Sequence, residues 1–296
     1  MTYQEFCDTT VSLVRLALPE NATADLSCIL KNNDTRLHAI TIHTEDVNIS
    51  PTIYLEQFYE RYNQGTDLKA IVDQILTIWQ ESEPKASVDV SFYSSYENVK
   101  ERLAFKLINL SRNEELLKDV PHLPYLDLAI VFYCLVNESL QGSATILVRN
   151  AHLAQWNKTV EDLFQQAEKN TPRLLAAELH DMNELLRSFP DLPEPFPPSE
   201  EPDNSMFVLS NRLKLNGASC ILYKDMLKTI SLHFQSDFYI LPSSIHEVIL
   251  LPAETNDAYE PLTHMVREVN ASQVASDEIL SDHVYYYSRE SQALCM

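Results

Sequence analysis

The chain has 296 residues, 45% of them hydrophobic, so it can bury a substantial core as one large domain or two modest ones. Its 43 Asp and Glu residues outnumber 22 Lys and Arg, and a net charge of −21 repels phosphate backbones and anionic lipid, so we expect neither nucleic acid nor a membrane surface as a partner. The three glycines lie far apart, which excludes the glycine-rich loops of a Rossmann fingerprint or a P-loop, and we expect no cofactor.

The five cysteines indicate a reduced protein of the cytoplasm. They are odd in number and dispersed, and most lie in apolar segments, which is typical of small core residues and of neither a disulfide framework nor a zinc site. The N-terminal segment has acidic residues and no basic stretch ahead of an apolar run, so it does not resemble a signal peptide. No apolar run reaches the roughly 20 residues that span a bilayer. We therefore expect a cytoplasmic protein without a metal site.

The first ninety or so residues are predicted to combine helices with one hairpin. Apolar residues at helical spacing predict a helix over Tyr3–Leu18. Two β-branched, apolar runs, Leu26–Leu30 and Leu37–His43, flank the turn-forming residues KNNDTR and predict a hairpin. From Pro51 the apolar period returns to 3.6 residues and predicts two further helices, which Gly65 separates.

The middle of the chain holds the most hydrophobic stretch of the sequence. This stretch, Leu126–Val136, is expected to be a central strand that pairs with Ala144–Arg149 across a polar turn. The secondary structure of the apolar run Ala104–Leu110 stays open. Helical spacing predicts helices over Ser95–Leu103, Ala151–Asn170 (in two segments) and Glu178–Arg187.

One composition shift divides the chain. The segment Ser188–Asn204 is rich in proline and carboxylates and has few large apolar residues, so ordering it would cost about 1 to 2 kcal/mol per residue in backbone entropy with little burial in return. We interpret it as an exposed linker or arm. The predicted organisation is an N-terminal α+β part over 1–187, the arm over 188–204, and a C-terminal α+β part over 205–296.

The C-terminal part is centred on a hairpin over 238–251. Its strands, Phe238–Leu241 and Val248–Leu251, are apolar on both faces, which places them inside a sheet that is covered on both sides. Hairpins that alternate with helices predict an α+β fold with mixed, mostly antiparallel sheets, and they fit αββα-type repeats near 25–80, 126–170 and 238–270. The other predicted elements are strands over 206–210 and 284–287 and helices over 223–234 and 259–270.

The rim of this hairpin is the first candidate site. His246 and Glu247 stand beside Ser243 and Ser244, so a base, an acid and two hydroxyl groups lie within five positions. Adjacent strand residues point to opposite faces, however, so His246 and Glu247 cannot easily act on one substrate atom. The sequence therefore favours the alternative, a polar strand end or turn cap.

A second candidate site follows the predicted strand Ala144–Arg149. Asn150, His152 and Trp156 could form the rim of a ligand-binding site, to which Lys224 is a further candidate. Asn150 is also a suitable N-cap for a helix that begins at the next residue, and capping is the favoured interpretation. Lys224 is better explained as an ion-pair partner in so acidic a chain.

Several segments, spread over nearly the whole chain, carry a resemblance to one family of proteins. They are NEELLKDVPHLPYLDLAIVFYCLV, ATILVRNAHLAQW, GASCILY, YILPSSIHEVILLP and VREVNASQVASDEILSDHVYYY. Together they resemble the bacterial family catalogued as domain of unknown function 5688. The resemblance implies a bacterial cytosolic protein, and it transfers no reaction and no catalytic residue.

Two functions follow as hypotheses. The first is a non-enzymatic cytosolic protein that acts through protein–protein interaction, because the sequence shows no coherent catalytic constellation and offers a proline-rich acidic arm and the tyrosines of 285–287 as contact surfaces. The alternative is a hydrolase-like enzyme or small-ligand binder that uses the rim of the 238–251 hairpin.

Overall fold

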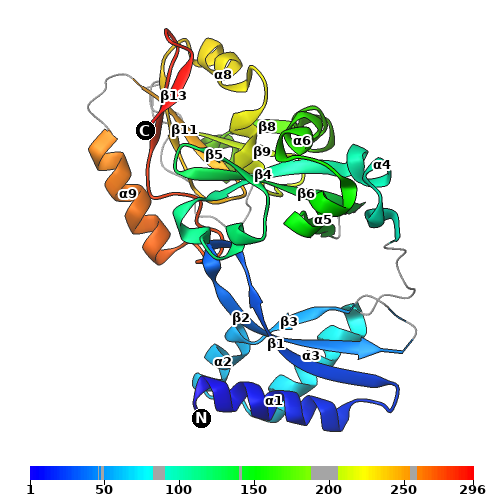
Figure 1. Ribbon diagram of the computed structural model, residues 1–296. Helices are drawn as coiled ribbons and strands as arrows, with labels where there is room; N and C mark the ends of the chain where they lie inside the picture. The colour runs from blue at the N-terminus through cyan, green and yellow to red at the C-terminus, as the bar shows by residue number, and fades with distance from the viewer. Residues whose placement is uncertain (46, 48–49, 83–90, 140–141, 188–205, 254–258) are drawn as a thin grey trace. The chain divides into compact units, whose positions relative to one another are not determined.

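The computed structural model describes residues 1–45, 47, 50–82, 91–139, 142–187, 206–253 and 259–296 (Figure 1). The chain forms two compact units. The first contains Met1–Lys31 and Thr35–Phe92, and the second contains Asn32–Asp34 and Tyr93–Met296. The second unit thus includes the three residues at the tip of the first hairpin.

The first unit packs three helices on an antiparallel sheet of three strands. Helix α1 begins with a reciprocal capping box in which Thr2 and Glu5 each accept a hydrogen bond from the other's backbone N–H. Phe6, Ile40 and Ile75 belong to the core between the helices and the sheet. The elements are α1 (Tyr3–Ala17), β1 (Ala22–Leu30), β2 (Arg36–Thr44), β3 (Thr52–Tyr54), α2 (Glu56–Asn63) and α3 (Leu68–Ser82), and the strand order is β1-β2-β3.

The predicted first helix and first hairpin are confirmed. The predicted helix after Pro51 begins later than expected, because Thr52–Tyr54 pairs with Ala39–Thr41 as the third strand before α2 starts at Glu56. Gly65 has a φ of +100° at the end of α2, as a helix-ending glycine should.

A four-stranded antiparallel sheet in the second unit is built around β6. Strand β6 pairs with β4 on one side and with β5 and then β7 on the other. The predicted central strand and its pairing across the polar turn are therefore confirmed, and the apolar run left open is a strand. The bounds are β4 (Leu103–Asn109), β5 (His122–Tyr125), β6 (Leu128–Ser139) and β7 (Gly142–Leu147).

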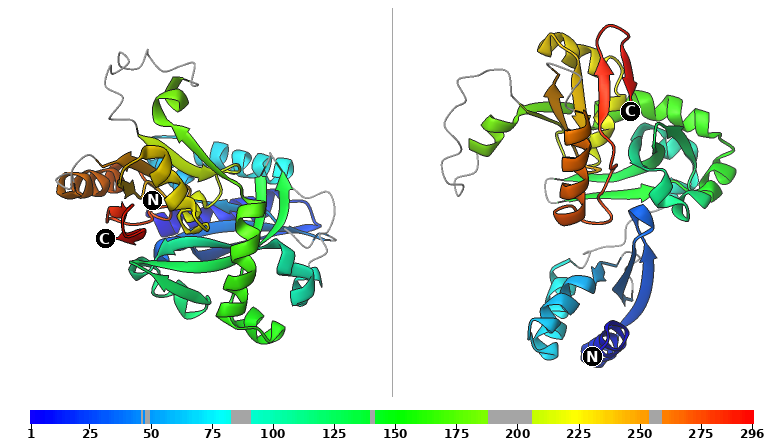
Figure 2. Two further views of the ribbon diagram at one scale, coloured as in Figure 1. Left: turned by 90° about the horizontal axis from the view of Figure 1, so that it is seen from above. Right: turned by 90° about the vertical axis from the view of Figure 1, so that its left-hand side faces the viewer.

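A six-stranded antiparallel sheet in the same unit contains the C-terminal hairpin. All four residues of β10 are buried, and β10 lies between β11 and β12, as the apolar character of both faces predicts. Helix α9 covers one face, where Val266 packs against Tyr239 and Leu241 (Figure 2). The order is β13-β12-β10-β11-β9-β8, with β8 (Ala177–Asp181), β9 (Phe207–Asn211), β10 (Phe238–Leu241), β11 (Val248–Pro252), β12 (Tyr285–Ser288) and β13 (Ala293–Cys295).

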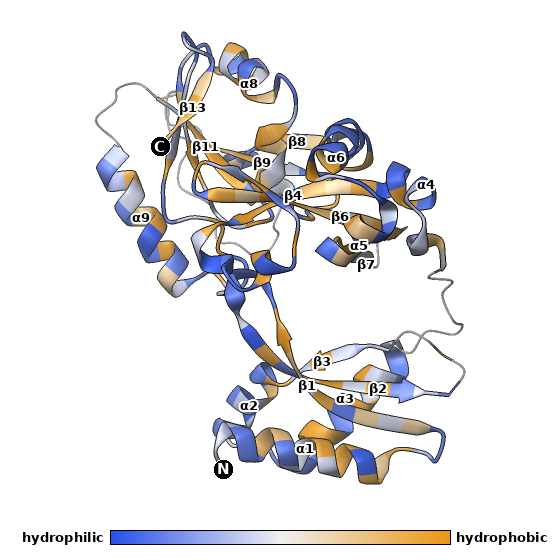
Figure 3. Ribbon diagram, in the orientation of Figure 1, coloured by the Kyte–Doolittle hydropathy of each residue, from blue (hydrophilic) through white to orange (hydrophobic). Residues whose placement is uncertain are grey.

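The helices of the second unit lie mostly where helical spacing predicts them. There are two exceptions. Leu103, at the end of the predicted helix Ser95–Leu103, is the first residue of strand β4. Glu178–Asp181 belongs to strand β8 and pairs with β9 before the helix begins at Met182. In Figure 3 the strands of this unit are mostly hydrophobic, whereas α9 alternates between polar and apolar residues. The helices are α4 (Tyr96–Val99), α5 (Asn150–Trp156), α6 (Val160–Leu174), α7 (Met182–Arg187), α8 (Met226–Phe234) and α9 (Tyr259–Ser272).

The fold class is α+β with antiparallel sheets, as predicted. The arm over 188–204 lies outside the described residues, and the strands before and after it, β8 and β9, are neighbours in one sheet. The two predicted parts therefore share a sheet. Among the described residues, no helix combines the length and apolar character that crossing a membrane requires.

Candidate functional site

The four candidates at the hairpin rim lie in the loop between β10 and β11. Ser244 is buried, its hydroxyl accepts a hydrogen bond from the N–H of His246 at 3.0 Å, and its own N–H donates to the carbonyl of Glu247 at 3.2 Å. The hydroxyl of Ser243 lies 3.4 Å from Oε1 of Glu247. These bonds close the loop on itself.

The ring of His246 is tied to neighbouring segments. The backbone N–H of Asn216 donates to Nδ1 at 3.2 Å, so Nδ1 is an acceptor and the neutral ring carries its proton on Nε2, which lies 3.7 Å from a carboxylate oxygen of Glu278. The carbonyl of His246 accepts a bond from Ser210 Oγ at 2.8 Å. Because the one lone pair of the neutral ring is already used, these contacts support a role for His246 in holding the loop.

The second candidate set belongs to an aromatic cluster. Tyr93 meets the rings of His152 and Trp156 edge to face at 4.8 and 5.2 Å, and His152 stacks on Trp156 at 5.6 Å. The indole N–H of Trp156 donates to the carbonyl of Tyr93 at 3.1 Å. Burial, with Arg149 nearby, lowers the pKa of His152. These rings pack on one another and fix the segment around Tyr93 against α5.

Asn150 does not cap α5. The helix has Arg149 at its N-cap position, and His152 Nδ1 accepts the N–H of Arg149 at 2.9 Å. The side chain of Asn150 instead donates to the carbonyl of Lys118 at 3.1 Å. Lys224 is exposed and lies in the chain just ahead of α8. The structure thus brings His152 and Trp156 together, whereas the contacts of His246 involve Ser210, Asn216 and Glu278.

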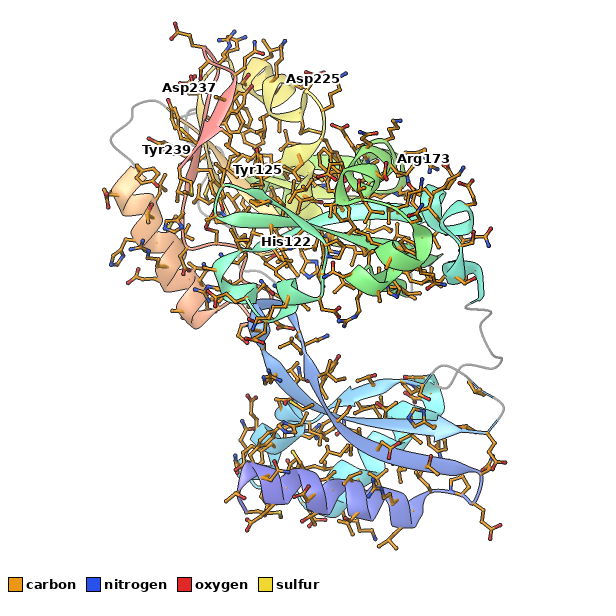
Figure 4. All side chains as sticks on the ribbon, in the orientation of Figure 1. His122, Tyr125, Arg173, Asp225, Asp237 and Tyr239 are labelled. Atoms are coloured by element: carbon orange, nitrogen blue, oxygen red, sulfur yellow. The ribbon has the colours of Figure 1, made fainter. Side chains whose placement is uncertain are left out.

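A polar cluster around Asp127, which no sequence pattern indicated, is built by the fold of the second unit. This residue follows Leu126, which has a φ of 55° in the tight turn after Tyr125 at the end of β5 (Figure 4). Its carboxylate accepts hydrogen bonds from Ser281 Oγ at 2.6 Å and Tyr285 Oη at 2.7 Å, and lies 3.1 Å from Nδ1 of His283. Burial beside this carboxylate raises the pKa of Tyr285.

The Asp127–His283 pair has the geometry of an acid–base dyad. Nδ1 of His283 faces the carboxylate, so Nε2 points away from it, and the His283 side chain is 46% exposed while that of Asp127 is 19% exposed. A carboxylate that holds Nδ1–H in this way keeps Nε2 free to take up a proton. Sequence reasoning missed the pair because 156 positions separate the two residues. Among the described residues, no group of three or more His, Cys, Asp or Glu is arranged to hold a metal ion.

The segment 276–284, between α9 and β12, is held by side chains from distant parts of the second unit. Asn32 donates to the carbonyl of Asp277 at 2.8 Å, and Asn33 donates to those of Ser276 and Ile279 at 2.8 and 2.7 Å. The amide of Asn109 donates to the carbonyl of Leu280 at 3.0 Å. The residues of the predicted KNNDTR turn are therefore anchors as well as a turn.

A different kind of site is the outer edge of β1 in the first unit. Residues of an antiparallel strand alternate between facing one neighbour and facing away from it. The carbonyl of Ala24 accepts a bond from Arg15 Nε at 2.7 Å, and the N–H of Ala22 donates to the carbonyl of Pro19 at 3.1 Å, so both residues face away from β2. Because the direction alternates from residue to residue, the N–H and C=O groups of Leu26, Cys28 and Leu30 also face away from β2, on the outer edge.

In the part of the chain that the structure describes, this outer edge is open from Leu26 to Leu30. Among the hydrogen bonds between described residues, none reaches the outward backbone groups of Leu26, Cys28 and Leu30. Cys28 is exposed and the two leucines are half-buried. Natural edge strands are usually protected by proline, lysine, a bulge or a covering segment, and the nine residues of β1 contain neither proline nor lysine and pair with β2 without a break in register.

The edge of β4 shows what a protected edge looks like in this chain. There α6 lies along the strand, and the N–H of Phe105 donates to Thr171 Oγ1 at 3.1 Å. The buried amide of Asn170 donates to the carbonyls of Lys100 and Leu103 at 2.6 and 3.0 Å. Arg173, in the last turn of α6 (Figure 4), donates to the carbonyl of Glu101 at 2.9 Å. Side chains thus close the β4 edge, whereas among the described residues a side chain bonds the outer edge of β1 only at Ala24, from Arg15.

Comparison with known protein families identifies a match. The model of a family described as "Family of unknown function (DUF5688)" matches residues 3–289 of this chain. No curated protein and no solved structure matches it.

Proposed function

The chain belongs to this family of unknown function, and we propose that it is a non-enzymatic protein of the bacterial cytoplasm that binds another protein by adding a β-strand to the outer edge of β1. The observation that carries this proposal is the run of outward backbone groups at Leu26, Cys28 and Leu30. An extended segment beside them forms main-chain hydrogen bonds, each of which contributes about 0.5 to 1.5 kcal/mol net.

The charge of the chain indicates which segments suit this edge. Residues 1–92 contain 14 Asp and Glu and 6 Lys and Arg, and the whole chain carries −21. Asp25 is exposed, and its side chain lies on the face of β1 that points away from the core. A segment that places a basic residue opposite Asp25 is therefore favoured, because opposite charges across neighbouring strands stabilise the pair.

The test replaces Cys28 by proline. The N–H of Cys28 faces away from β2, so proline removes an outward donor and leaves the β1–β2 ladder intact, whereas the matched variant Cys28→Val keeps the donor. We expect partners captured from a cell lysate to be lost about tenfold or more with Cys28→Pro and kept with Cys28→Val. Hydrogen exchange of the purified complex should show new protection at Leu26, Cys28 and Leu30.

Circular dichroism of both variants checks that they fold alike. Capture that Cys28→Pro leaves unchanged, or protection that falls on other segments, would show that the edge of β1 is not the binding site.

An enzymatic function is the second candidate, and the Asp127–His283 dyad is the observation that favours it over the hairpin rim. A general base contributes about 10² to 10⁴ in rate. If the chain hydrolyses chromogenic esters or phosphate esters, His283→Ala should lower the rate about a hundredfold or more, and His246→Ala and Glu247→Gln should leave it unchanged. A loss of rate in His246→Ala and Glu247→Gln alone would place the active site at the rim of Ser243, Ser244, His246 and Glu247. Equal rates in all variants would exclude both the dyad and the rim as active sites.

A further inference from the structure

The open part of β1 is complementary to itself. We call the open stretch from Leu26 to Leu30 the window. It begins after Ala24, whose carbonyl accepts a hydrogen bond from Arg15 at 2.7 Å, and it ends before Lys31, whose N–H donates to Thr35 at 2.8 Å within the hairpin. Three outward residues remain, and Cys28 is the middle one. We infer that the strand taken up by β1 is the β1 of a second copy of this chain, paired antiparallel about Cys28. This inference rests on the proposed function and names its partner.

The register follows from the position of the window. A two-fold axis at Cys28 places Cys28 opposite Cys28 of the second copy and Leu26 opposite Leu30. All three outward residues then form hydrogen-bonded pairs, in which opposite residues exchange both backbone bonds. A shift by two residues in either direction would place Ala24, or a residue beyond Leu30, opposite the window, and the carbonyl of Ala24 already has a partner. The centred register is the one that uses every open group.

The side chains beside this ladder are also complementary. In the same register Asp25 stands opposite Lys31 of the second copy, and the two-fold axis repeats that pair. The Asp25 side chain is 68% exposed, and its ion-pair neighbours Arg15 and His43 are no closer than 3.7 Å. The amino group of Lys31 lies 4.6 Å above the ring of Tyr54. Opposite charges at directly opposed strand positions stabilise pairing, and like charges there weaken it.

The sulfur atoms give the dimer a specific chemical signature. Opposed residues of a hydrogen-bonded antiparallel pair have Cα atoms about 5.5 Å apart, which lies inside the range of about 4.4 to 6.8 Å that a disulfide spans. Cys28 and Cys295 are exposed, and Cys7, Cys134 and Cys220 are buried. Burial raises the pKa of Cys134 to about 11 and that of Cys220 to about 12, so these thiols stay protonated and unreactive near pH 8.

The first experiment measures association and cross-linking of the full chain. We expect a dimer that increases with protein concentration in sedimentation velocity at physiological salt. Diamide, which accepts the two hydrogens released as two thiols form one disulfide, should cross-link the wild type and Cys295→Ser, and it should not cross-link Cys28→Ser. A chain that stays monomeric throughout, or a cross-link that requires Cys295, overturns the inference.

The second experiment reverses the charges. Asp25→Lys alone places two lysines opposite each other, and Lys31→Asp alone places two carboxylates opposite each other. Each single variant should weaken the dimer about tenfold. The double variant Asp25→Lys with Lys31→Asp restores opposite charges, so its affinity should return to near the wild-type value. A double variant as weak as the single ones would show that the two positions do not face each other.

The outcomes separate this inference from the proposed function. If the chain is monomeric but Cys28→Pro still releases captured partners, then β1 takes a strand from a different protein. In that case only the identification of the partner as a second copy of this chain is wrong. If Cys28→Pro changes neither capture nor dimerisation, the edge of β1 is not a binding site and both fail.

Discussion

Replacement of Gly217 by alanine is expected to lower the free energy of unfolding by about 3 kcal/mol or more. A Cβ atom at this position would lie 2.3 Å from Ser210 Oγ, 2.4 Å from the carbonyl oxygen of His246 and 2.9 Å from the backbone nitrogen of Asn211. Two of these atoms belong to the backbone, one in the buried strand β9 and one in the loop between β10 and β11 that is bonded to Ser210, and they cannot move aside cheaply. Urea unfolding followed by tryptophan fluorescence measures the loss.

Gly65→Ala is the matched control for this substitution. Gly65 has a φ of +100°, and a Cβ there would meet no atom within 4 Å, so alanine adds only the cost of the left-handed backbone, about 1 kcal/mol. The overlap at Gly217 predicts a clearly larger loss. Equal losses in the two variants would mean that the packing of the 242–247 loop on Gly217 is looser than the structure indicates.

Removal of the Asp127 carboxylate is expected to cost about 3 to 5 kcal/mol of unfolding free energy in Asp127→Ala. The hydroxyl groups of Ser281 and Tyr285 both donate to it, and both residues have no exposed surface. The substitution leaves two buried donors without an acceptor, and each such donor costs about 1 to 3 kcal/mol. Thermal and urea unfolding at pH 7 provide the measurement.

A double substitution separates this cause from a general loss of packing. The double variant Asp127→Ala with Tyr285→Phe has one unpaired buried donor fewer, so it should be more stable than Asp127→Ala alone. The comparison variant is Asp237→Ala, because Asp237 (Figure 4) also accepts a tyrosine hydroxyl, from Tyr286 at 2.6 Å, but at a partly exposed position. A loss at Asp127 no larger than at Asp237 would contradict this account.

The elements that could be predicted from the sequence are those whose signal is local. Phe238–Leu241 is apolar on both faces, and the structure buries all four residues in the middle of a sheet. The hairpin of β1 and β2 follows from two apolar runs around a polar turn. Glu178–Asp181 fails as a helix because its partner strand, Phe207–Asn211, comes about 30 residues later, and that distant pairing overrides the local helical pattern.

The sites depend on geometry that no local pattern carries. Asp127 and His283 are ordinary polar residues in the sequence, and only the fold places them 3.1 Å apart. The openness of β1 is equally invisible, because side-chain alternation tells which face of a strand is buried and says nothing about which edge is paired. The bonds from Arg15 to Ala24 and from Ala22 to Pro19 show which backbone groups of β1 face outward.

The way segment 276–284 is held has a consequence for how the second unit reaches its native state. Asn32 meets Asp277 across 245 positions of sequence, and Asn109 meets Leu280 across 171. Contacts between such distant residues slow folding, because the entropy of closing large loops must be paid before the contacts form. During synthesis on the ribosome, these asparagines emerge long before their acceptors. Chains stalled before Ser276 would therefore expose unpaired strands and polar groups, which makes such partly synthesised chains substrates for chaperones.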